Sequence, residues 1–169
     1  MFEREHLELV DGELISKMGK NRPHVHNLTM MLVWLQEVFG RTLVNPAAPI
    51  DVSPEDNERN EPEPDVVVLN RESGTFRGNP QPHDLKLVVE ISDSTLGFDL
   101  SIKADLYARA GIVEYWVVDV SGRRLIVHRT PAAGKYSSVI VYGENEPVAP
   151  LSAPNAEFQF ARVLGPTNV

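Results

Sequence analysis

The order strand, helix, strand in the middle of the chain is the feature that most restricts the possible folds. An apolar run, "LKLVVEIS" (residues 85–92), is followed by the helical pattern "DLSIKADLYARAG" and then by a second apolar run, "IVEYWVVDV". Continuous apolar runs of this length are typical of strands buried on both faces. Two strands joined by a helix are expected to be parallel, with a right-handed connection. The sequence therefore predicts a sheet that is parallel at this point and covered by a helix.

Elements before and after this unit extend the sheet. Asp11-Gly12, between two arms of alternating polarity, is a strong hairpin signal because both turn residues need positive φ. Apolar residues at three- and four-residue steps from Val25 to Phe39 predict a helix that ends at Gly40. Four further segments are expected to be strands: "RTLVN", "DVVVLN", "RLIVHRT" and "AAGKYSSVIVYGE". The final "AEFQFARVL" is expected to be an edge strand or a short helix.

The expected fold class is mixed α/β (α+β). The middle of the chain has the order αβββαβ, an N-terminal β-hairpin precedes it and additional C-terminal strands follow, which gives a mixed sheet with helices packed on it. The chain has 169 residues, of which 42% are hydrophobic, and contains no internal repeat or linker. We therefore expect residues 1–169 to form a single domain.

Composition excludes several classes of protein. The net charge of −8 argues against a protein that coats nucleic acid through bulk charge, although clustered carboxylates that bind cations can still face phosphate. The absence of Cys excludes disulfides and a thiolate zinc site. No apolar run is long enough to span a bilayer, so no membrane partner is expected. The charged start "MFEREHLELV" lacks the apolar core of a signal peptide, which favours a cytoplasmic location.

Two acids lie at buried strands. Asp65 opens "DVVVL", and Glu90 lies near the end of "LVVEIS", where an unpaired carboxylate is strongly unfavourable. If the two strands are neighbours, both carboxylates reach one edge of the sheet. Mg²⁺ prefers oxygen ligands and is often held by one or two carboxylates. The backbone carbonyl of Ile91 is a further candidate ligand.

The helix between the two strands carries an acid, a base and a phenol at four-residue steps. Asp99, Lys103 and Tyr107 therefore share one face. An apolar stripe is expected on a neighbouring face, formed by Ile102, Leu106 and Ala110. The plainer alternative is a surface ion pair between Asp99 and Lys103, with Tyr107 at the edge of the core. Because ligands bind at the carboxyl ends of strands in open α/β sheets, we expect Lys103 to reach Glu90, with Asp99 positioning Lys103.

Two acids and a lysine are the groups that metal-assisted phosphodiester hydrolysis requires. A bound metal lowers the pKa of water and balances the charge that develops on phosphate. A lysine can orient or deprotonate that water, or stabilise the charge on the reacting phosphate. The pattern therefore predicts a nuclease site built on Asp65, Glu90 and Lys103.

Three segments carry a resemblance to a known family. They are "LVDGEL", "EPDVVVL" and "LVVEISDSTLGFDLSIKADLYARAGIVEYWVVD". They resemble the Uma-two family of bacterial restriction-endonuclease-like proteins, which belongs to the PD-(D/E)XK nuclease superfamily. The resemblance implies a restriction-endonuclease-like core at about residues 24–119. It also implies that Asp65 and Glu90 bind the metal and that Lys103 is the catalytic lysine.

Further positions match the family. Glu13 of "LVDGEL" resembles its N-terminal acid and is expected to complete the metal shell, the alternative being an exposed hairpin acid. Either His24 or His26 matches a family histidine, and the sequence leaves the choice open. The simplest superfamily pattern has a lysine two residues after Glu90, where this chain has Ser92, so the lysine is expected to have moved to position 103.

We therefore expect a Mg²⁺- or Mn²⁺-dependent endonuclease with DNA as its substrate. A non-catalytic protein that uses the nuclease fold to bind a partner or a nucleic-acid end is the alternative, and a hydrolase of small phosphate esters is a third interpretation. Cutting both strands of a duplex with one site per chain favours a symmetric homodimer. The segment "EYWVVD" and the terminal strands are the expected surfaces for self-association.

Overall fold

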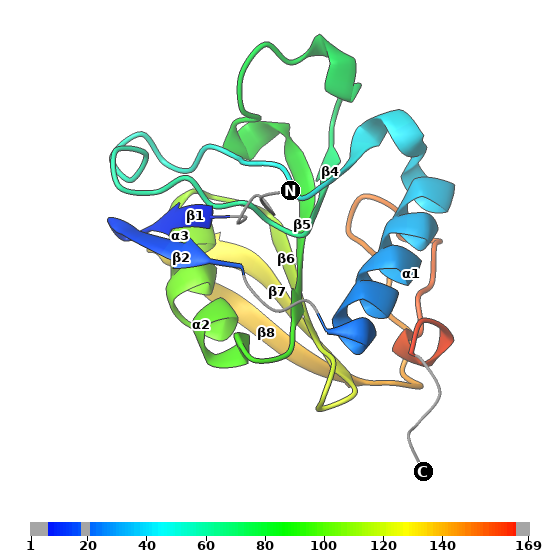
Figure 1. The fold of residues 1–169 in the computed structure, drawn as a ribbon. Coiled ribbons are helices and arrows are strands. Elements are labelled where there is room, and N and C mark those ends of the chain that lie inside the picture. Colours follow the sequence, from blue (N-terminus) through cyan, green and yellow to red (C-terminus); the bar gives the residue numbers. More distant parts are fainter. Residues whose placement is uncertain (1–6, 18–20, 165–169) are drawn as a thin grey trace, which may run out of the picture.

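The computed structural model describes residues 7–17 and 21–164. They form a two-stranded hairpin and a six-stranded mixed sheet that has helices on both of its faces (Figure 1). The order of the elements confirms the expected mixed α+β fold with an αβββαβ core. None of the helices in these residues is long and apolar enough to cross a membrane.

The N-terminal hairpin consists of β1 (Leu7–Val10) and β2 (Glu13–Ser16). Its turn is the predicted one, because Asp11 and Gly12 have φ values of 53° and 83°. The hairpin is not part of the main sheet, and backbone hydrogen bonds join it to the loop before β4. Leu9 and Glu61 exchange two such bonds, at 3.2 and 2.8 Å.

Helix α1 (Arg22–Phe39) confirms the first predicted helix. Asn21 caps its N-terminus, where the Asn21 side chain accepts a hydrogen bond from the backbone N–H of His24 at 2.9 Å. The helix ends at Gly40, whose φ of 92° lies in a region that favours glycine.

The six strands of the main sheet have the same order in space as in the sequence. They are β3 (Val44–Pro46), β4 (Val66–Leu69), β5 (Leu85–Ser92), β6 (Glu114–Asp119), β7 (Arg124–Ala132) and β8 (Lys135–Gly143). Strands β5 and β6 are parallel, and the other neighbours are antiparallel. The crossover between β5 and β6 consists of α2 (Leu96–Leu100) and α3 (Ile102–Arg109), which confirms the predicted parallel pair.

Short 3₁₀ segments complete the description. They are η1 (Arg41–Leu43), η2 (Ser73–Thr75), η3 (Pro82–Asp84) and η4 (Phe160–Arg162). The segment "RTLVN", expected to be a strand, begins as η1, and pairing with β4 starts only at Val44. In the C-terminal tail the short helix is present as η4, and Phe158 forms an isolated antiparallel bridge with Val148.

The sheet separates two apolar cores. On one face, Trp34 of α1 packs against Trp116 of β6 and Phe158 of the tail, with ring centroids 6.3 and 4.6 Å away. On the other face, Tyr107 of α3 meets Tyr115 of β6 edge-on, with centroids 4.9 Å apart. Strand β6 contributes to both cores, and all of its residues are buried. The expectation that "EYWVVD" serves self-association is therefore not met.

Candidate functional site

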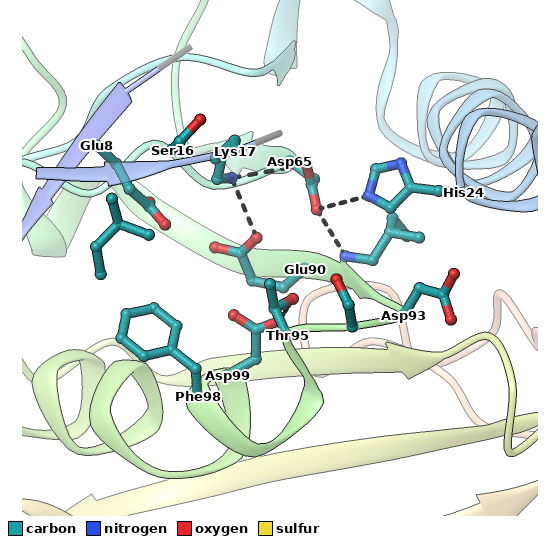
Figure 2. Close-up of a pocket in the computed structure, with 13 residues that line it drawn as sticks. Glu8, Ser16, Lys17, His24, Asp65, Glu90, Asp93, Thr95, Phe98 and Asp99 are labelled. Atoms are coloured by element: carbon teal, nitrogen blue, oxygen red, sulfur yellow. Dashed lines mark hydrogen bonds and ion pairs between the residues drawn. The ribbon is translucent and has the colours of Figure 1, made fainter. Parts of the chain in front are cut away.

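Asp65 and Glu90 lie side by side where β4 begins and β5 approaches its end (Figure 2). Val66 of β4 pairs with Val89 of β5, which makes the two acids cross-strand neighbours. Asp65 Oδ2 also accepts a hydrogen bond from the N–H of Ile91 at 2.8 Å. Both acids are buried, with 4% and 2% of their surfaces exposed. The structure thus brings together the two acids that the sequence predicts to converge.

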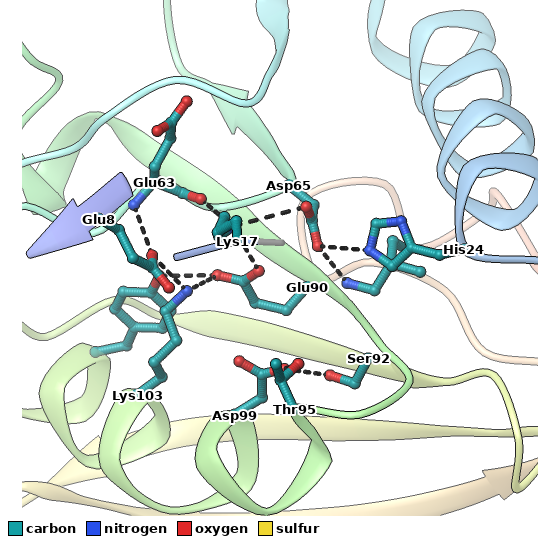
Figure 3. A network of polar contacts seen from close by, with 12 residues as sticks. Glu8, Lys17, His24, Glu63, Asp65, Glu90, Ser92, Thr95, Asp99 and Lys103 are labelled. Carbon is teal, nitrogen blue, oxygen red and sulfur yellow. Dashed lines mark hydrogen bonds and ion pairs between the residues drawn. The ribbon is translucent and has the colours of Figure 1, made fainter. Parts of the chain in front are cut away.

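Glu90 is met by side chains from helix α3 (Figure 3). Lys103 Nζ lies 2.5 Å from Glu90 Oε1 and 2.9 Å from Glu8 Oε2. The hydroxyl of Tyr107 donates to the same Glu90 oxygen at 3.2 Å. Lys103 is completely buried, so this is an interior ion pair rather than the surface pair with Asp99 that was the plainer alternative.

One residue of the apolar stripe expected on the crossover helix is exposed. Ile102, expected in the buried stripe, is 47% exposed, whereas Lys103 and Tyr107 face the interior. Ile102 is the first residue of α3, which a break at Ser101 separates from α2, with φ and ψ of −119° and −83° that are not helical. Asp99, Lys103 and Tyr107 are all buried, in agreement with the predicted shared face, and Leu106 is 1% exposed.

The N-terminal acid of the site is Glu8, not Glu13. Glu13 pairs with Val10 beside the hairpin turn, where it is exposed and does not line the pocket. Glu8 pairs with Ile15 at the open end of the hairpin and is 4% exposed. Besides contacting Lys103, Glu8 Oε2 accepts a hydrogen bond from the backbone N–H of Glu63 at 3.1 Å. The expected contribution of Glu13 to the metal shell is therefore corrected.

Lys17, directly after β2, reaches between the two central acids (Figures 2 and 3). Its Nζ lies 3.6 Å from Asp65 Oδ1 and 3.5 Å from Glu90 Oε2, and it also donates to the carbonyl of Glu63. The cavity lined by these groups has a volume of about 60 Å³. Its polar lining suits water molecules or a hydrated cation.

Asp99 lines the same pocket but does not contact Lys103 directly. Its Oδ2 accepts hydrogen bonds from the hydroxyls of Ser92 and Thr95, the latter at 2.8 Å. The position that holds lysine in the simplest superfamily pattern is thus occupied by a serine that binds Asp99. Lys103 forms its direct ion pairs with Glu8 and Glu90. The expectation that Asp99 positions Lys103 is therefore corrected, because Asp99 does not form such a pair with it.

Of the two candidate histidines, the structure brings His24 to the pocket. Its Nε2 lies 3.8 Å from Asp65 Oδ2, and its Nδ1 is buried without a hydrogen-bond partner among the described residues. His26 is exposed and does not line the pocket.

The two central acids have opposite pKa shifts. Burial raises the pKa of Glu90 to about 8, an effect opposed by the two neighbouring lysines and reinforced by the neighbouring aspartates. For Asp65, burial is outweighed by contact with His24, by the charge of Lys17 and by the Ile91 N–H. These contacts hold the pKa of Asp65 well below its usual range.

The lysines of the site are also shifted. Burial would lower the pKa of Lys103 and of Lys17, but the carboxylate of Glu90 and its acidic neighbours raise both values above the usual one. The pKa values of Glu90 and of both lysines are thus raised for different reasons, burial in the case of Glu90 and neighbouring carboxylates in the case of the lysines.

The charge and donor chemistry of the site fit a divalent cation. Four carboxylates face two ammonium groups: Glu8, Asp65, Glu90 and Asp99 against Lys17 and Lys103. Carboxylate oxygens suit Mg²⁺ and Mn²⁺, and Mg²⁺ is often held by two of them plus water. Within residues 7–17 and 21–164, no group of three or more His, Cys, Asp or Glu side chains is arranged to hold a metal. Asp65 and Glu90, the two acids at the centre of the pocket, are the candidate ligands. The carbonyl of Ile91 as a further ligand stays a prediction.

Sequence reasoning missed Glu8 and Lys17. A signal for both exists in the hairpin register, which the Asp11-Gly12 turn defines. That register places Glu8 opposite Ile15 and on the same face as the buried Val10, and it carries Lys17 to the same open end.

Comparison with known proteins adds a family and a related fold. The model of the Uma2 family, described as "Putative restriction endonuclease", matches residues 1–162. A comparison with curated proteins finds no match.

Among solved structures, the chain is similar to one described as a "putative nuclease belonging to DUF820 from Anabaena variabilis ATCC 29413". The TM-score is 0.69 at 14% sequence identity, and the match covers 93% of this chain and 88% of the other. At that identity the similarity shows a shared fold. The family match covers nearly the whole chain and agrees with the resemblance carried by "EPDVVVL" and the crossover segment. The chain therefore belongs to the Uma2 family, which is described as "Putative restriction endonuclease".

Proposed function

We propose that this protein is a divalent-metal-dependent endonuclease that hydrolyses DNA phosphodiester bonds. The observation that supports this most is that Asp65 and Glu90 line one pocket rich in acids, with the buried ammonium of Lys103 in contact with Glu90. These residues come from three elements that are separate in the sequence. Family membership supports the same reaction class.

Each residue has a distinct task in this proposal. Asp65 and Glu90 hold Mg²⁺ or Mn²⁺, which when bound lowers the pKa of water and balances charge on the phosphate. Lys103, enclosed by Glu8 and Glu90, fixes the orientation of Glu90 and supplies positive charge next to the reacting phosphate. Tyr107 supports the Glu90 oxygen that Lys103 contacts.

Cleavage assays on the purified protein test the proposal. Supercoiled plasmid, linear duplex, single-stranded DNA and RNA are incubated with Mg²⁺, with Mn²⁺ or with EDTA. We expect DNA cleavage that requires the added cation and stops with EDTA. If no nucleic acid is cut under any of these conditions and calorimetry detects no cation binding, the endonuclease proposal fails.

A non-catalytic protein that uses this fold for binding is the second candidate. The observation that favours it is the position of Lys17, whose ammonium already bridges Asp65 and Glu90. In that case the polar network would be a structural ion-pair cluster. The absence of cation binding in the assay above is the outcome that this candidate predicts.

We also propose a symmetric homodimer formed through β8. This strand lies at the edge of the main sheet, pairs with β7 on one side, and has three consecutive half-exposed aliphatic residues. They are Val139, Ile140 and Val141, with 51%, 46% and 51% of their surfaces exposed. An edge strand with such residues is a template for pairing with a second copy.

Light scattering of an Ile140→Lys variant tests the dimer. We expect the wild type to have twice the chain mass of 18.8 kDa at micromolar concentration. The variant is expected to be monomeric, because a charge at the centre of the edge opposes strand pairing. Val33→Lys places the same charge at an exposed aliphatic residue of α1 and should leave the dimer intact. A monomeric wild type, or a dimeric Ile140→Lys variant, contradicts this interface.

A further inference from the structure

The four carboxylate oxygens of Asp65 and Glu90 form two pairs with different partners. Asp65 Oδ2 accepts the Ile91 N–H at 2.8 Å, and Glu90 Oε1 contacts Lys103 Nζ at 2.5 Å. The other two oxygens, Asp65 Oδ1 and Glu90 Oε2, contact Lys17 Nζ at 3.6 and 3.5 Å. Lys17 is the one side chain of the described residues in ion-pair contact with these two oxygens (Figure 3). The oxygens that the rest of the site leaves for a cation are therefore the two that Lys17 occupies.

Lys17 lies farther from the carboxylates that it contacts than Lys103 does, while its ammonium also donates to the backbone carbonyl of Glu63. Its distances of 3.5 and 3.6 Å to the carboxylates compare with 2.5 and 2.9 Å for Lys103. The Lys17 side chain is 16% exposed and the Lys103 side chain 1%. Lys103 is held in a helix against the sheet, whereas Lys17 follows the last residue of β2. A lysine ammonium on a flexible four-carbon stem can leave such a site by side-chain rotation.

We propose that Lys17 is a built-in competitor of the metal ion, whose ammonium holds Asp65 and Glu90 together and must leave them before a divalent cation binds. The inference rests on the proposed function, because it takes Asp65 and Glu90 as the metal ligands. Mg²⁺ binds oxygen at about 2.0–2.1 Å. An ammonium placed between the same two oxygens blocks that approach.

Two consequences follow for the site. Without metal, Lys17 offsets part of the repulsion between two buried carboxylates, which stabilises the arrangement of β4 and β5. With metal, the coupling is reciprocal, so that cation binding displaces Lys17 and Lys17 weakens cation binding. Lys17 therefore sets the cation concentration at which the site is loaded.

Calorimetric titration with Mn²⁺ tests this in three variants of the full chain. Lys17→Met removes the competing charge and is expected to lower the Kd for Mn²⁺ by about tenfold. Lys17→Arg keeps the charge and should remain close to the wild type. Lys135→Met removes one positive charge at a 71% exposed lysine that is paired with Asp105, and it should also bind like the wild type.

Amine labelling of the wild type provides a measurement that needs no variant. The protein is acetylated with limiting reagent, with and without Mn²⁺, and each lysine is quantified by mass spectrometry. We expect Mn²⁺ to increase the labelling of Lys17, to leave Lys103 unlabelled, and not to change Lys135.

The outcomes separate this inference from the proposed function. If the wild type binds Mn²⁺ but Lys17→Met binds it no more tightly, or Lys17 labelling is unchanged by the bound ion, Lys17 is not a competitor and the metal site still stands. If neither the wild type nor Lys17→Met binds Mn²⁺, both the competitor role and the metal-dependent function are overturned.

Discussion

Replacement of Lys103 by methionine is expected to lower the free energy of unfolding by about 3–5 kcal/mol. Lys103 is fully buried, and its ammonium contacts the carboxylates of Glu8 and Glu90, which are 4% and 2% exposed. Methionine fills a similar volume but leaves both acids without their closest positive charge. Chemical denaturation of the wild type and the variant measures the difference.

A double mutant and a surface control make this prediction specific. Adding Glu8→Gln to Lys103→Met removes one of the two buried carboxylates that have lost the Lys103 ammonium. The double variant should therefore be more stable than Lys103→Met alone. Lys135→Met makes the same replacement in an exposed pair and should change stability by less than about 1 kcal/mol. An equal effect of Lys103→Met and Lys135→Met would contradict the buried network.

The lower stability of Lys103→Met also influences its cleavage activity. A loss of cleavage in Lys103→Met has two possible causes, loss of the reacting charge and loss of the fold. Cleavage should therefore be compared per folded molecule, below the temperature at which the variant unfolds. Only the loss that persists under those conditions is due to the chemistry.

Asp65→Asn is expected to weaken Mn²⁺ binding and to lower the cleavage rate by at least about 100-fold each. Asparagine has the same shape and can still accept the Ile91 N–H hydrogen bond at its remaining oxygen. It loses the negative charge that attracts the cation, while the fold is retained. Calorimetry with Mn²⁺ and a plasmid-cleavage time course measure the two effects.

Asp93→Asn is the matched control for this substitution. Asp93 lines the same pocket, but its oxygens accept hydrogen bonds from Ser121 and Asn21 rather than facing Lys17. We expect its cation binding and cleavage to stay near the wild-type values. If Asp65→Asn behaves like Asp93→Asn, Asp65 is not a metal ligand.

Most of the fold could be predicted from the sequence because its signals are local. The Asp11-Gly12 turn, the Gly40 helix end and the parallel crossover all depend on short-range chemistry, and all three are present. The division of the crossover helix into α2 and α3 could not be predicted. Its break at Ser101 depends on how the chain turns from β5 onto the sheet, and no proline or glycine at that position signals it.

The central acids of the site were accessible to prediction for a similar reason. Asp65 directly precedes β4 and Glu90 lies in β5, and the apolar sequences of these strands identify them as buried, so a charge there needs an explanation. Glu8 and Lys17 belong to a hairpin that is a separate two-stranded sheet. Where such a unit docks depends on tertiary contacts, such as the bonds between Leu9 and Glu61, that no periodicity encodes.

Two separate units form the pocket: the main sheet with its crossover helix, and the N-terminal hairpin. Asp65, Glu90 and Lys103 are anchored by the main sheet and its crossover helix, whereas Glu8 and Lys17 are delivered by the hairpin. Hydrogen bonds with residues 59–63 and the buried side chain of Val10 hold the hairpin in place. Local opening of such a unit costs less free energy than global unfolding. Detachment would withdraw one acid and one base together, leaving the charge of the pocket unchanged. It would also uncover the oxygens of Asp65 and Glu90 that Lys17 contacts.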